Sequence, residues 1–392
     1  MELFNPHSNE WLLNKFEIYK TLQAMDTAYF SEQHNGYVIT RYDDVKFVLK
    51  NHDIFSSARG NLIRESPYRF NRTLGASDDP VHGMLKDIVK ESYSKNNIQR
   101  IVDCFVEKSN NLITETNHIF NLSEVVQEAS AWASAEILNL PHDKTEIKNL
   151  VLGILQYSSW SVMYNTDQSH YIKFNELIIN LLKNQVPSTG PGIYHEFITN
   201  SKDNTLLSLF SGPTISGAGS LAGSLGFLTL DIYRENLLDK LIKDPSLIEN
   251  VVDESLRYNC SSGRKIRTVT KDVTLHNVQL KRGDKVIVSL EAANRDPIMF
   301  PDPDKFILGR DNAGDLSYGY GMHACIALAI SRELLKSWVK VLIDSLGEYK
   351  VLTSPSQFVY QMTSSGNQDS ITNLIIEKHN EICTQPVFNN QP

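Results

Sequence analysis

The sequence contains few cysteines, and none stands in the pairs that bind zinc. Its four cysteines, Cys104, Cys260, Cys325 and Cys383, are widely separated along 392 residues and include no C-x-x-C pair. This spacing gives no zinc signature and suits a reducing cytosol. A dense run of Lys and Arg is also absent, and the formal net charge is −8. The composition therefore argues against a general nucleic-acid-binding protein.

Features that divide a chain or anchor it in a membrane are equally scarce. No Pro/Gly/Ser-rich linker, charge block or internal repeat interrupts the sequence, and hydrophobic residues make up 41% of it, which is ample for a large core. We therefore expect one large domain over residues 1–392. The start of the chain, Met1–Asn5, carries neither a basic leader nor a long apolar run. We expect a cytoplasmic protein with no membrane association, and a monomer.

The most informative feature present is the segment Leu316–Cys325. Two glycines let its backbone fold tightly beneath a flat group, and His323 precedes the lone thiol of Cys325 by two residues. An apolar, helix-forming run, Ile326–Val339, follows directly. A thiolate at a helix N-terminus is stabilised by the helix dipole and by free N–H donors. On spacing alone the pattern fits a small buried hydrophobic residue as well as a metal ligand.

Two further motifs favour the metal ligand. The string Tyr318-x-x-Gly321-x-His323-x-Cys325 resembles the haem-binding loop of the cytochrome P-450 superfamily. In the family's order, Glu254-Ser255-Leu256-Arg257 resembles the E-x-x-R pair of its long core helix, and Ala292–Pro303 resembles the segment that leads into the haem loop. The resemblance spans the chain from roughly Met1 to Lys378.

The resemblance implies a mainly α-helical fold with small β-sheets, in which haem lies between a central helix and the cysteine loop. It implies haem b (iron protoporphyrin IX), with Cys325 as the iron ligand whose thiolate favours O–O cleavage. The implied function is a haem-thiolate oxidoreductase, an oxygen-dependent monooxygenase that acts on a small organic molecule in natural-product biosynthesis. Dioxygen and a ferredoxin with its reductase are the implied partners.

Periodicity predicts how the elements follow one another. It indicates a helix over 9–25, a strand at 37–39, a short helix over 43–49, a loop over 57–77, helices from 80 to 243, strands over 269–280 and 285–290 around a turn at 281–284, and a β-like segment over 358–376.

Four residues are candidates to bind the two haem propionates. His82 and Lys86 are four apart and share one helix face. The resemblance assigns the same task to Arg267, five residues before Asp272, and to His323. Lys86 stands where the family usually has Arg, so it keeps the charge but loses the bidentate geometry. Each of the four could instead be a solvated surface charge.

Glu254 and Arg257 are predicted to stabilise the fold. At i and i+3 they lie on one helix face, and buried ions persist only when they are paired and hydrogen-bonded. The resemblance adds a third residue, Arg310. We interpret these residues as a structural lock behind the haem.

The distal helix departs from the family pattern of an acid followed by threonine. In the stretch Ser216–Ser224, Gly219 takes the place of the acid and Ser220 that of the threonine. Counting back from Glu254 shifts the match by one, to Ala218 and Gly219. Neither register supplies a carboxylate. Gly219 and Ser220 are our candidates for the catalytic positions on this side.

Glycines at 217, 219 and 223 each cost about 1 kcal/mol relative to alanine inside a helix. They indicate either a close helix crossing or a groove above the haem, and we favour the groove. Pro213 either starts the helix or kinks it.

The missing acid leaves three functional alternatives open. In a monooxygenase, Ser220, water or the substrate would relay protons. In an atypical haem-thiolate enzyme, the reaction would be oxidative coupling, cyclisation or a peroxide-driven oxidation. A non-catalytic recruitment or sensor protein is the third alternative, but such a protein has no need of the Cys325 thiolate.

The sequence offers candidate residues for binding the substrate and the electron donor, but it singles none of them out. Arginines that could bind a carboxylate lie in the loop 59–72 (Arg59, Arg64, Arg69, Arg72), and aromatic residues that could form a lid are Tyr157, Trp160, Tyr164 and Tyr171. Ordinary surface exposure and helix packing explain both sets equally well. A basic patch for an acidic electron donor could form from Lys86, Lys90, Lys95, Arg332, Lys336 and Lys340.

Overall fold

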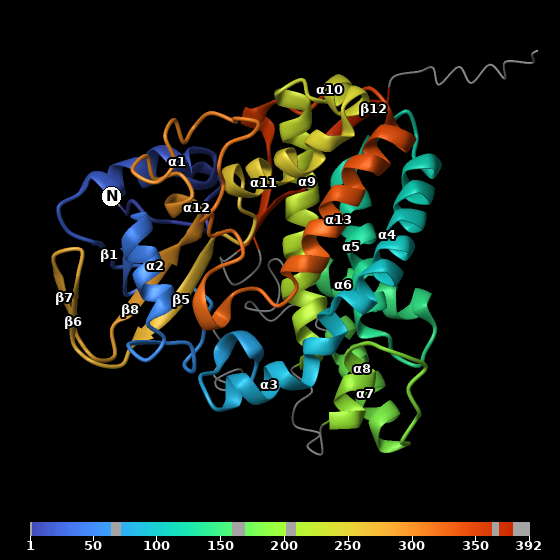
Figure 1. Cartoon of the computed structure of the whole chain (residues 1–392), viewed down its shortest axis with the longest axis horizontal. Helices are drawn as coiled ribbons and strands as arrows, with labels where there is room; N and C mark the ends of the chain where they lie inside the picture. The colour runs from blue at the N-terminus through green and yellow to red at the C-terminus, as the bar shows by residue number, and fades with distance from the viewer. Residues whose placement is uncertain (1, 64–71, 159–168, 201–208, 363–367, 379–392) are drawn as a thin grey trace, which may run out of the picture.

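The structure is a computed structural model that describes residues 2–63, 72–158, 169–200, 209–362 and 368–378. The expected plan of many helices with small sheets is confirmed in these ranges. Figure 1 shows a sheet-containing half around β5 and β8 and a helical half around α9 and α13.

The described ranges contain α-helices of very different lengths. Their bounds are α1 Asn9–Ala24, α2 Tyr42–Lys50, α3 Val81–Val89, α4 Lys95–Glu115, α5 Leu122–Leu138, α6 Lys144–Ser158, α7 Ser169–Lys183, α8 Ile193–Asn200, α9 Ala218–Arg234, α10 Leu238–Lys243, α11 Ile248–Tyr258, α12 Leu290–Ala293 and α13 Leu328–Val341.

The largest sheet has the strand order β1-β2-β8-β5-β3. Its strands are β1 Tyr29–Ser31, β2 Gly36–Ile39, β8 Lys285–Ser289, β5 Arg264–Val269 and β3 Phe55–Ser56. Strands β2 and β8 pair in parallel, whereas β8 pairs antiparallel with β5, so that Arg267 lies opposite Val286.

The remaining strands form small antiparallel sheets. They are β6 Val273–Leu275 with β7 Val278–Leu280, β10 Tyr360–Met362 with β11 Asp369–Ile371, and β12 Ile375–Lys378 between β4 Ile119–Asn121 and β9 Tyr349–Val351.

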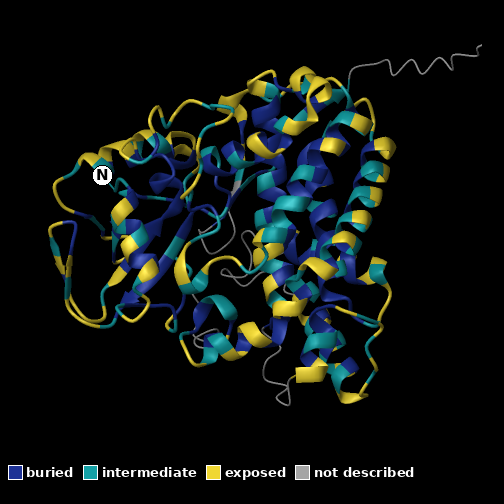
Figure 2. Ribbon diagram, viewed as in Figure 1, coloured by how far each residue is buried: buried dark blue, intermediate teal, exposed yellow. Residues whose placement is uncertain are grey.

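Helix α9 forms the centre of the helical half and packs against α5, α11 and α13. Figure 2 shows buried residues concentrated where these helices face one another. Trp338 donates its indole N–H to the hydroxyl of Thr229 at 2.9 Å, which ties α13 to α9. The stretch Gly212–Arg234 is long and apolar enough to cross a membrane by length and composition, but most of it is buried inside the protein, as expected of a core helix.

Several predicted elements are confirmed, with shifted ends. Helix α1, strand β2 and helix α2 match the predicted segments to within a residue or two. The predicted strand over 269–280 is instead the end of β5 followed by the hairpin of β6 and β7, and most of β5, which begins at Arg264, was not predicted. Helix α13 begins at Leu328 and not at Ile326, because the residues after Cys325 complete the preceding turn.

A buried cluster of charges ties the two ends of the chain to the sheet. Lys15 of α1 binds Glu291 (2.5 Å) and Asp369 (2.7 Å), and Arg264 of β5 binds the same two carboxylates. Tyr19 donates its hydroxyl to Glu291 at 2.7 Å. Two cations and two anions neutralise one another here, which is the condition for burying such groups.

Asp231 on α9 is a buried carboxyl that forms no ion pair with the residues the structure describes. It is 1% exposed and accepts hydrogen bonds from the hydroxyl of Ser255 and the side-chain amide of Asn259, both at 2.7 Å. Burial raises the pKa of Asp231 to about 7, although these two bonds oppose the rise.

This raised pKa predicts a pH-dependent stability. Between pH 4 and 7 the folded protein holds a proton at Asp231 that the unfolded chain has lost, so the free energy of unfolding falls as pH rises. In Asp231→Asn the amide oxygen can still accept from Asn259, and the amide NH2 can donate to the Ser255 hydroxyl in place of accepting from it. This uncharged variant should remove that fall and stabilise the protein above pH 7 by at most about 4 kcal/mol. Urea unfolding from pH 4 to 8 measures the effect, with exposed Asp344→Asn as the control. Parallel pH profiles for wild type and Asp231→Asn would contradict the prediction.

Candidate active site

A tight turn carries the lone thiol that the sequence singled out. Gly319 and Gly321 both have φ of 72°, in the left-handed region that favours glycine. A Cβ on Gly321 would lie 2.7 Å from the backbone oxygen of Leu49, so a larger residue would have to displace α2. The turn closes where the N–H of Cys325 donates to the carbonyl of Tyr318 at 2.8 Å. Both glycines are therefore needed to hold Cys325 in front of α13.

The Cys325 thiol is exposed to solvent, although many protein atoms surround it. Desolvation raises the pKa of Cys325, while the backbone N–H of Ala327 and the ammonium of Lys265 oppose that rise. The donor expected from a helix N-terminus is thus the N–H of Ala327, the residue just before α13. A sulfur that is enclosed yet open on one side can bind a ligand that approaches from that side.

Two histidines expected at the same site lie against each other beside this turn. The ring centroids of His82 and His323 are 4.4 Å apart with an interplanar angle of 69°. His82 donates from Nδ1 to the carbonyl of Leu74 at 3.0 Å. Within the described part of the chain, its Nε2 and both ring nitrogens of His323 are buried without a hydrogen-bond partner. Burial, followed by repulsion from Arg267 and His82, lowers the pKa of His323 to about 3.

Arg267 on β5 brings a buried positive charge to these histidines. Its side chain is buried and donates to the backbone oxygen of Ile266 at 2.7 Å, but it forms no ion pair with any carboxylate in the described ranges. Burial lowers the pKa of Arg267 to about 10, and the nearby charge of Asp78 opposes this. In the described ranges the site therefore has a buried guanidinium without an ion pair and polar atoms without a hydrogen-bond partner, two costs that a bound anion would remove.

Lys86, the fourth predicted partner, does not join this cluster. It is exposed, whereas His82, one turn earlier on α3, is buried. Among the residues that the structure describes, Lys86 forms no hydrogen bond or ion pair. The predicted shared face of α3 therefore places only His82 against His323.

The chemistry of these residues fits haem, whose iron a cysteine thiolate can hold. The unsatisfied nitrogens of His82 and His323, with the guanidinium of Arg267, suit the two acidic groups of a porphyrin.

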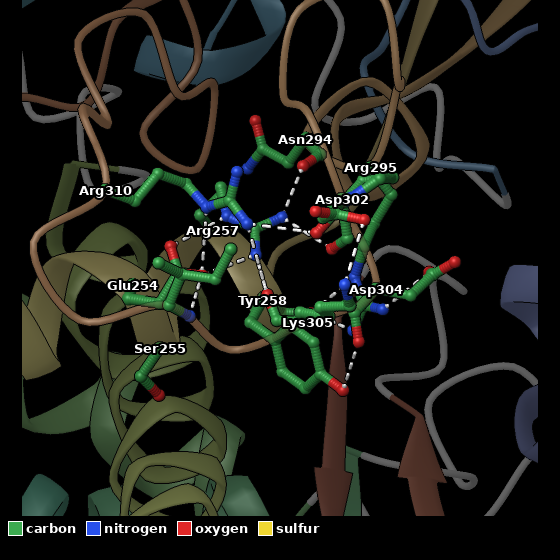
Figure 3. Close-up of polar contacts among 12 residues, drawn as sticks. Glu254, Ser255, Arg257, Tyr258, Asn294, Arg295, Asp302, Asp304, Lys305 and Arg310 are labelled. Carbon is green, nitrogen blue, oxygen red and sulfur yellow. Dashed lines mark hydrogen bonds and ion pairs between the residues drawn. The ribbon is translucent and has the colours of Figure 1, made fainter.

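Behind this site, Glu254 lies between two arginines (Figure 3). Arg257 donates to both carboxylate oxygens of Glu254, at 2.9 and 2.7 Å, and Arg310 donates to one of them at 3.1 Å. Burial alone would raise the pKa of Glu254, but hydrogen bonds from Arg257, the N–H of Ile307 and Arg310 hold it below its usual value. The predicted pairing of these three charged residues is confirmed.

The same network reaches the cysteine turn through Asn294. Arg257 donates to the backbone oxygen of Asn294 at 2.9 Å. The side chain of Asn294 accepts from the N–H of Leu316 (2.7 Å) and donates to the hydroxyl of Ser317 (2.9 Å), which in turn donates to the carbonyl of Leu256 (2.8 Å). These bonds fix the start of the turn relative to α11. The sequence singled out the Asn294 segment but not this task.

The segment that leads into α9 is wound more widely than an α-helix. Residues Gly212–Gly217, which include Pro213, form a π-helical turn that runs into α9. The Ser220 hydroxyl donates to the carbonyls of Ser216 (2.7 Å) and Gly217 (3.1 Å), and the amide of Gln368 donates to the same Ser216 carbonyl at 3.0 Å. A π-helical turn inside a helix is frequent at functional sites. Pro213 stands at the start of this turn, which agrees with the predicted alternative that it starts the helix, but the sequence pattern indicated neither the π-helical geometry nor Gln368.

The preference for a groove at all three glycines is wrong for Gly223. A Cβ there would lie 2.5 Å from the backbone oxygen of Asp369 and 3.0 Å from the Cβ of Ser261. Gly223 therefore allows α9 to cross β11 closely, which is the packing alternative. Three residues later, Gly226 has open space where its Cβ would be.

The expected substrate residues are only partly described. Arg59 and Arg72 are exposed, and Tyr171 is 36% exposed. Arg64, Arg69, Trp160 and Tyr164, and the side chain of Tyr157, lie outside the described residues.

Comparison with known proteins supports the class of haem protein that the sequence motifs indicated. The family model for cytochrome P-450 matches residues 236–336. Cytochrome P-450 165C4 of Amycolatopsis orientalis is 24% identical over 309 residues, 75% of this chain and 76% of that protein. The polyketide biosynthesis cytochrome P-450 PksS of Bacillus subtilis is 20% identical over 386 residues, 92% of this chain and 95% of that one.

A solved structure shows the same fold. The crystal structure of P-450BioI, in complex with an acyl carrier protein that carries hexadec-9Z-enoic acid, matches with a TM-score of 0.80 and 18% identity over 95% of this chain and all of that one. The family model, these relatives and the shared fold together support the cytochrome P-450 superfamily of bacterial type, and with it an oxidoreductase whose cofactor is haem.

The buried network predicts a large loss of stability when Glu254 is neutralised. Glu254→Gln leaves Arg257 and Arg310 without their shared counter-ion and should lower the free energy of unfolding by about 3–5 kcal/mol. Urea unfolding measures it. Lys271→Gln, which breaks the exposed pair with Asp53, should change stability little. Equal losses in the two variants would contradict a lock at Glu254.

The close crossing of α9 and β11 predicts opposite effects for two neighbouring glycines. Gly223→Ala should cost about 1–3 kcal/mol, because its methyl group meets the backbone of Asp369. Gly226→Ala should stabilise the helix by up to about 1 kcal/mol, because its methyl group has room. Thermal unfolding of both variants tests this. A stabilised Gly223→Ala would restore the groove interpretation.

Proposed function

We propose that this protein is an oxygen-dependent monooxygenase that acts on a small organic molecule in natural-product biosynthesis. The Cys325 thiol carries the proposal, because it is exposed to solvent and stands beside histidine nitrogens that are buried without a hydrogen-bond partner in the described residues. PksS, a relative similar over most of both chains, is named for polyketide biosynthesis, which supports a biosynthetic substrate.

Haem b is the proposed cofactor, with Cys325 as its axial ligand. Arg267, His82 and His323 are the proposed partners of its propionates. Their unpaired nitrogens and buried charge would be satisfied by two carboxylates. Lys86 is exposed, so we assign it at most a peripheral contact with the same groups. The whole chain, residues 1–392, is proposed to act as one domain around this cofactor.

Ser220 and Gly219 are proposed to line the oxygen-binding side. Because Gly219 supplies no carboxylate, a hydroxyl or water must hold the protons that oxygen cleavage consumes. The Ser220 hydroxyl already donates within its own helix, so it can accept a hydrogen bond from water while keeping its orientation. This arrangement supports a proton relay through water more than a direct proton transfer from the Ser220 hydroxyl.

The proposed partners are a small-molecule substrate, dioxygen and a ferredoxin with its reductase. Part of the expected basic patch is neutralised within the protein: Lys90 pairs with Asp87, Lys336 with Glu333, and Arg332 with Asp253. Exposed Lys95 and Lys340 keep their charge for an acidic donor. We propose a cytoplasmic monomer.

Spectroscopy of the reduced, carbon monoxide-bound protein tests the central assignment. The wild type should show the red-shifted Soret band of thiolate-bound haem, and Cys325→Ser should lose that band. Cys260→Ser, which changes a different cysteine, one that is buried, is the control and should keep the band. Purified wild type without haem, or an unchanged band in Cys325→Ser, would contradict the assignment.

Turnover then separates the remaining alternatives. A monooxygenase should convert its substrate with dioxygen, NAD(P)H and a surrogate ferredoxin pair. Conversion with peroxide alone, and none with dioxygen, would favour the atypical enzyme.

A further inference from the structure

Lys265 is a cation in this site that neither the fold nor the proposed chemistry uses. It lies on β5, where side chains alternate between the two faces of the sheet. Arg264 points to one face, where it binds Glu291 and Asp369. Lys265 and Arg267 share the other face, and Arg267 is close enough to His323 to lower its pKa. Lys265 therefore belongs to the face that the proposed cofactor would occupy.

The three cations of this strand differ in how their charge is balanced. Arg264 has two carboxylates, and Arg267 is stabilised by the nearby charge of Asp78. Lys265 has no ion pair within the described ranges, and its ammonium donates to the hydroxyl of Ser262 at 2.6 Å. Burial lowers the pKa of Lys265 to about 8, and repulsion from both arginines acts in the same direction. A half-buried ammonium with only a neutral partner is costly unless an anion neutralises it.

Neighbouring contacts locate this ammonium between the central helix and the cysteine turn. The Ser261 hydroxyl donates to the carbonyl of Ser220 at 2.8 Å and lies 2.8 Å from the hydroxyl of Ser224, so the loop before β5 is bound to α9. The same loop also contacts the segment that leads to Cys325, because the Cys260 thiol lies 3.9 Å from the carbonyl of Ser317, and the Lys265 ammonium is bound to this loop at Ser262. The N–H donors of Lys265 that Ser262 does not use thus lie beside the space between α9 and the cysteine turn.

We propose that Lys265 binds a carboxylate in the space between α9 and the cysteine turn. This inference rests on the proposed haem-thiolate function. A carboxylate fits because it neutralises one ammonium and accepts its remaining N–H bonds. Two sources have this chemistry, an acidic substrate and a haem propionate, and the two arms of the experiment below separate them.

The experiment compares holoenzymes of wild type, Lys265→Met and Lys265→Arg. The probes are laurate, benzoate and methyl laurate, and their binding is followed by calorimetry and by the loss of the iron-bound water signal in the Soret band. The rate of haem transfer to apomyoglobin reports how tightly the protein holds the propionates. Exposed Lys271→Met is the matched control, and the carbon monoxide spectrum confirms that each variant is folded around its haem.

An acidic substrate as the source predicts that Lys265→Met binds a carboxylate probe about tenfold or more weakly, with unchanged affinity for methyl laurate and unchanged haem transfer. A propionate as the source predicts faster haem transfer in Lys265→Met, with unchanged probe binding. In either case Lys265→Arg should restore most of the effect, because it keeps the charge.

The proposal is overturned if haem transfer is unchanged and neither carboxylate probe distinguishes wild type from Lys265→Met. Failure of the haem-thiolate function itself looks different, because the wild type would then contain no haem at all.

Discussion

Neutralisation of Glu254 inside the protein is the interaction on which the rest of the site depends. The carboxylate is fully buried, and two arginines and one backbone N–H satisfy it. Arg257 uses its remaining donors on the backbone oxygens of Asn294, Pro303 and Lys305 (Figure 3). Each buried charge is thereby tied to the segment that leads to Cys325. Moving that segment would expose an uncompensated ion to the interior, which explains how a long irregular stretch can hold one geometry.

The turn is positioned from this network by a short chain of bonds. Asn294 fixes Leu316 and Ser317, and the next residue, Tyr318, accepts the hydrogen bond that closes the turn at Cys325. These bonds join backbone groups and the buried side chains of Asn294 and Ser317, so little flexibility separates α11 from the thiol. A ligand sulfur must be held by such rigid surroundings if its position is to be set before the cofactor binds.

The sequence predicted this side of the molecule well because its constraints are local. Gly319 and Gly321 need positive φ, and Glu254 and Arg257 are neighbours on one helix turn, so the residue types reveal the geometry. Lys86 shows the limit of this reasoning. Spacing puts it on the same face as His82, but the long side chain reaches solvent, and no pattern within α3 says which of two neighbours is buried.

The roles of the glycines in the central helix could not be predicted in the same way, because they depend on contacts with backbone that is distant in the sequence. Gly223 is required by Asp369, almost 150 residues later, whereas Gly226 faces open space. No local pattern distinguishes the two. The π-helical turn before α9 and the bond from Gln368 also depend on tertiary contacts.

Charge balance along β5 joins the two sides of the molecule. Three cations occur within four residues, which would be unfavourable on a surface strand and is more so in a buried one. Alternation sends Arg264 to the carboxylates that tie α1 and β11 to the sheet, and it sends Lys265 and Arg267 to the face near Cys325. One face is neutral within the protein, and the other is not. On one face of β5 a basic residue stabilises the fold, and on the other face the basic residues keep a positive charge that a bound acid could neutralise.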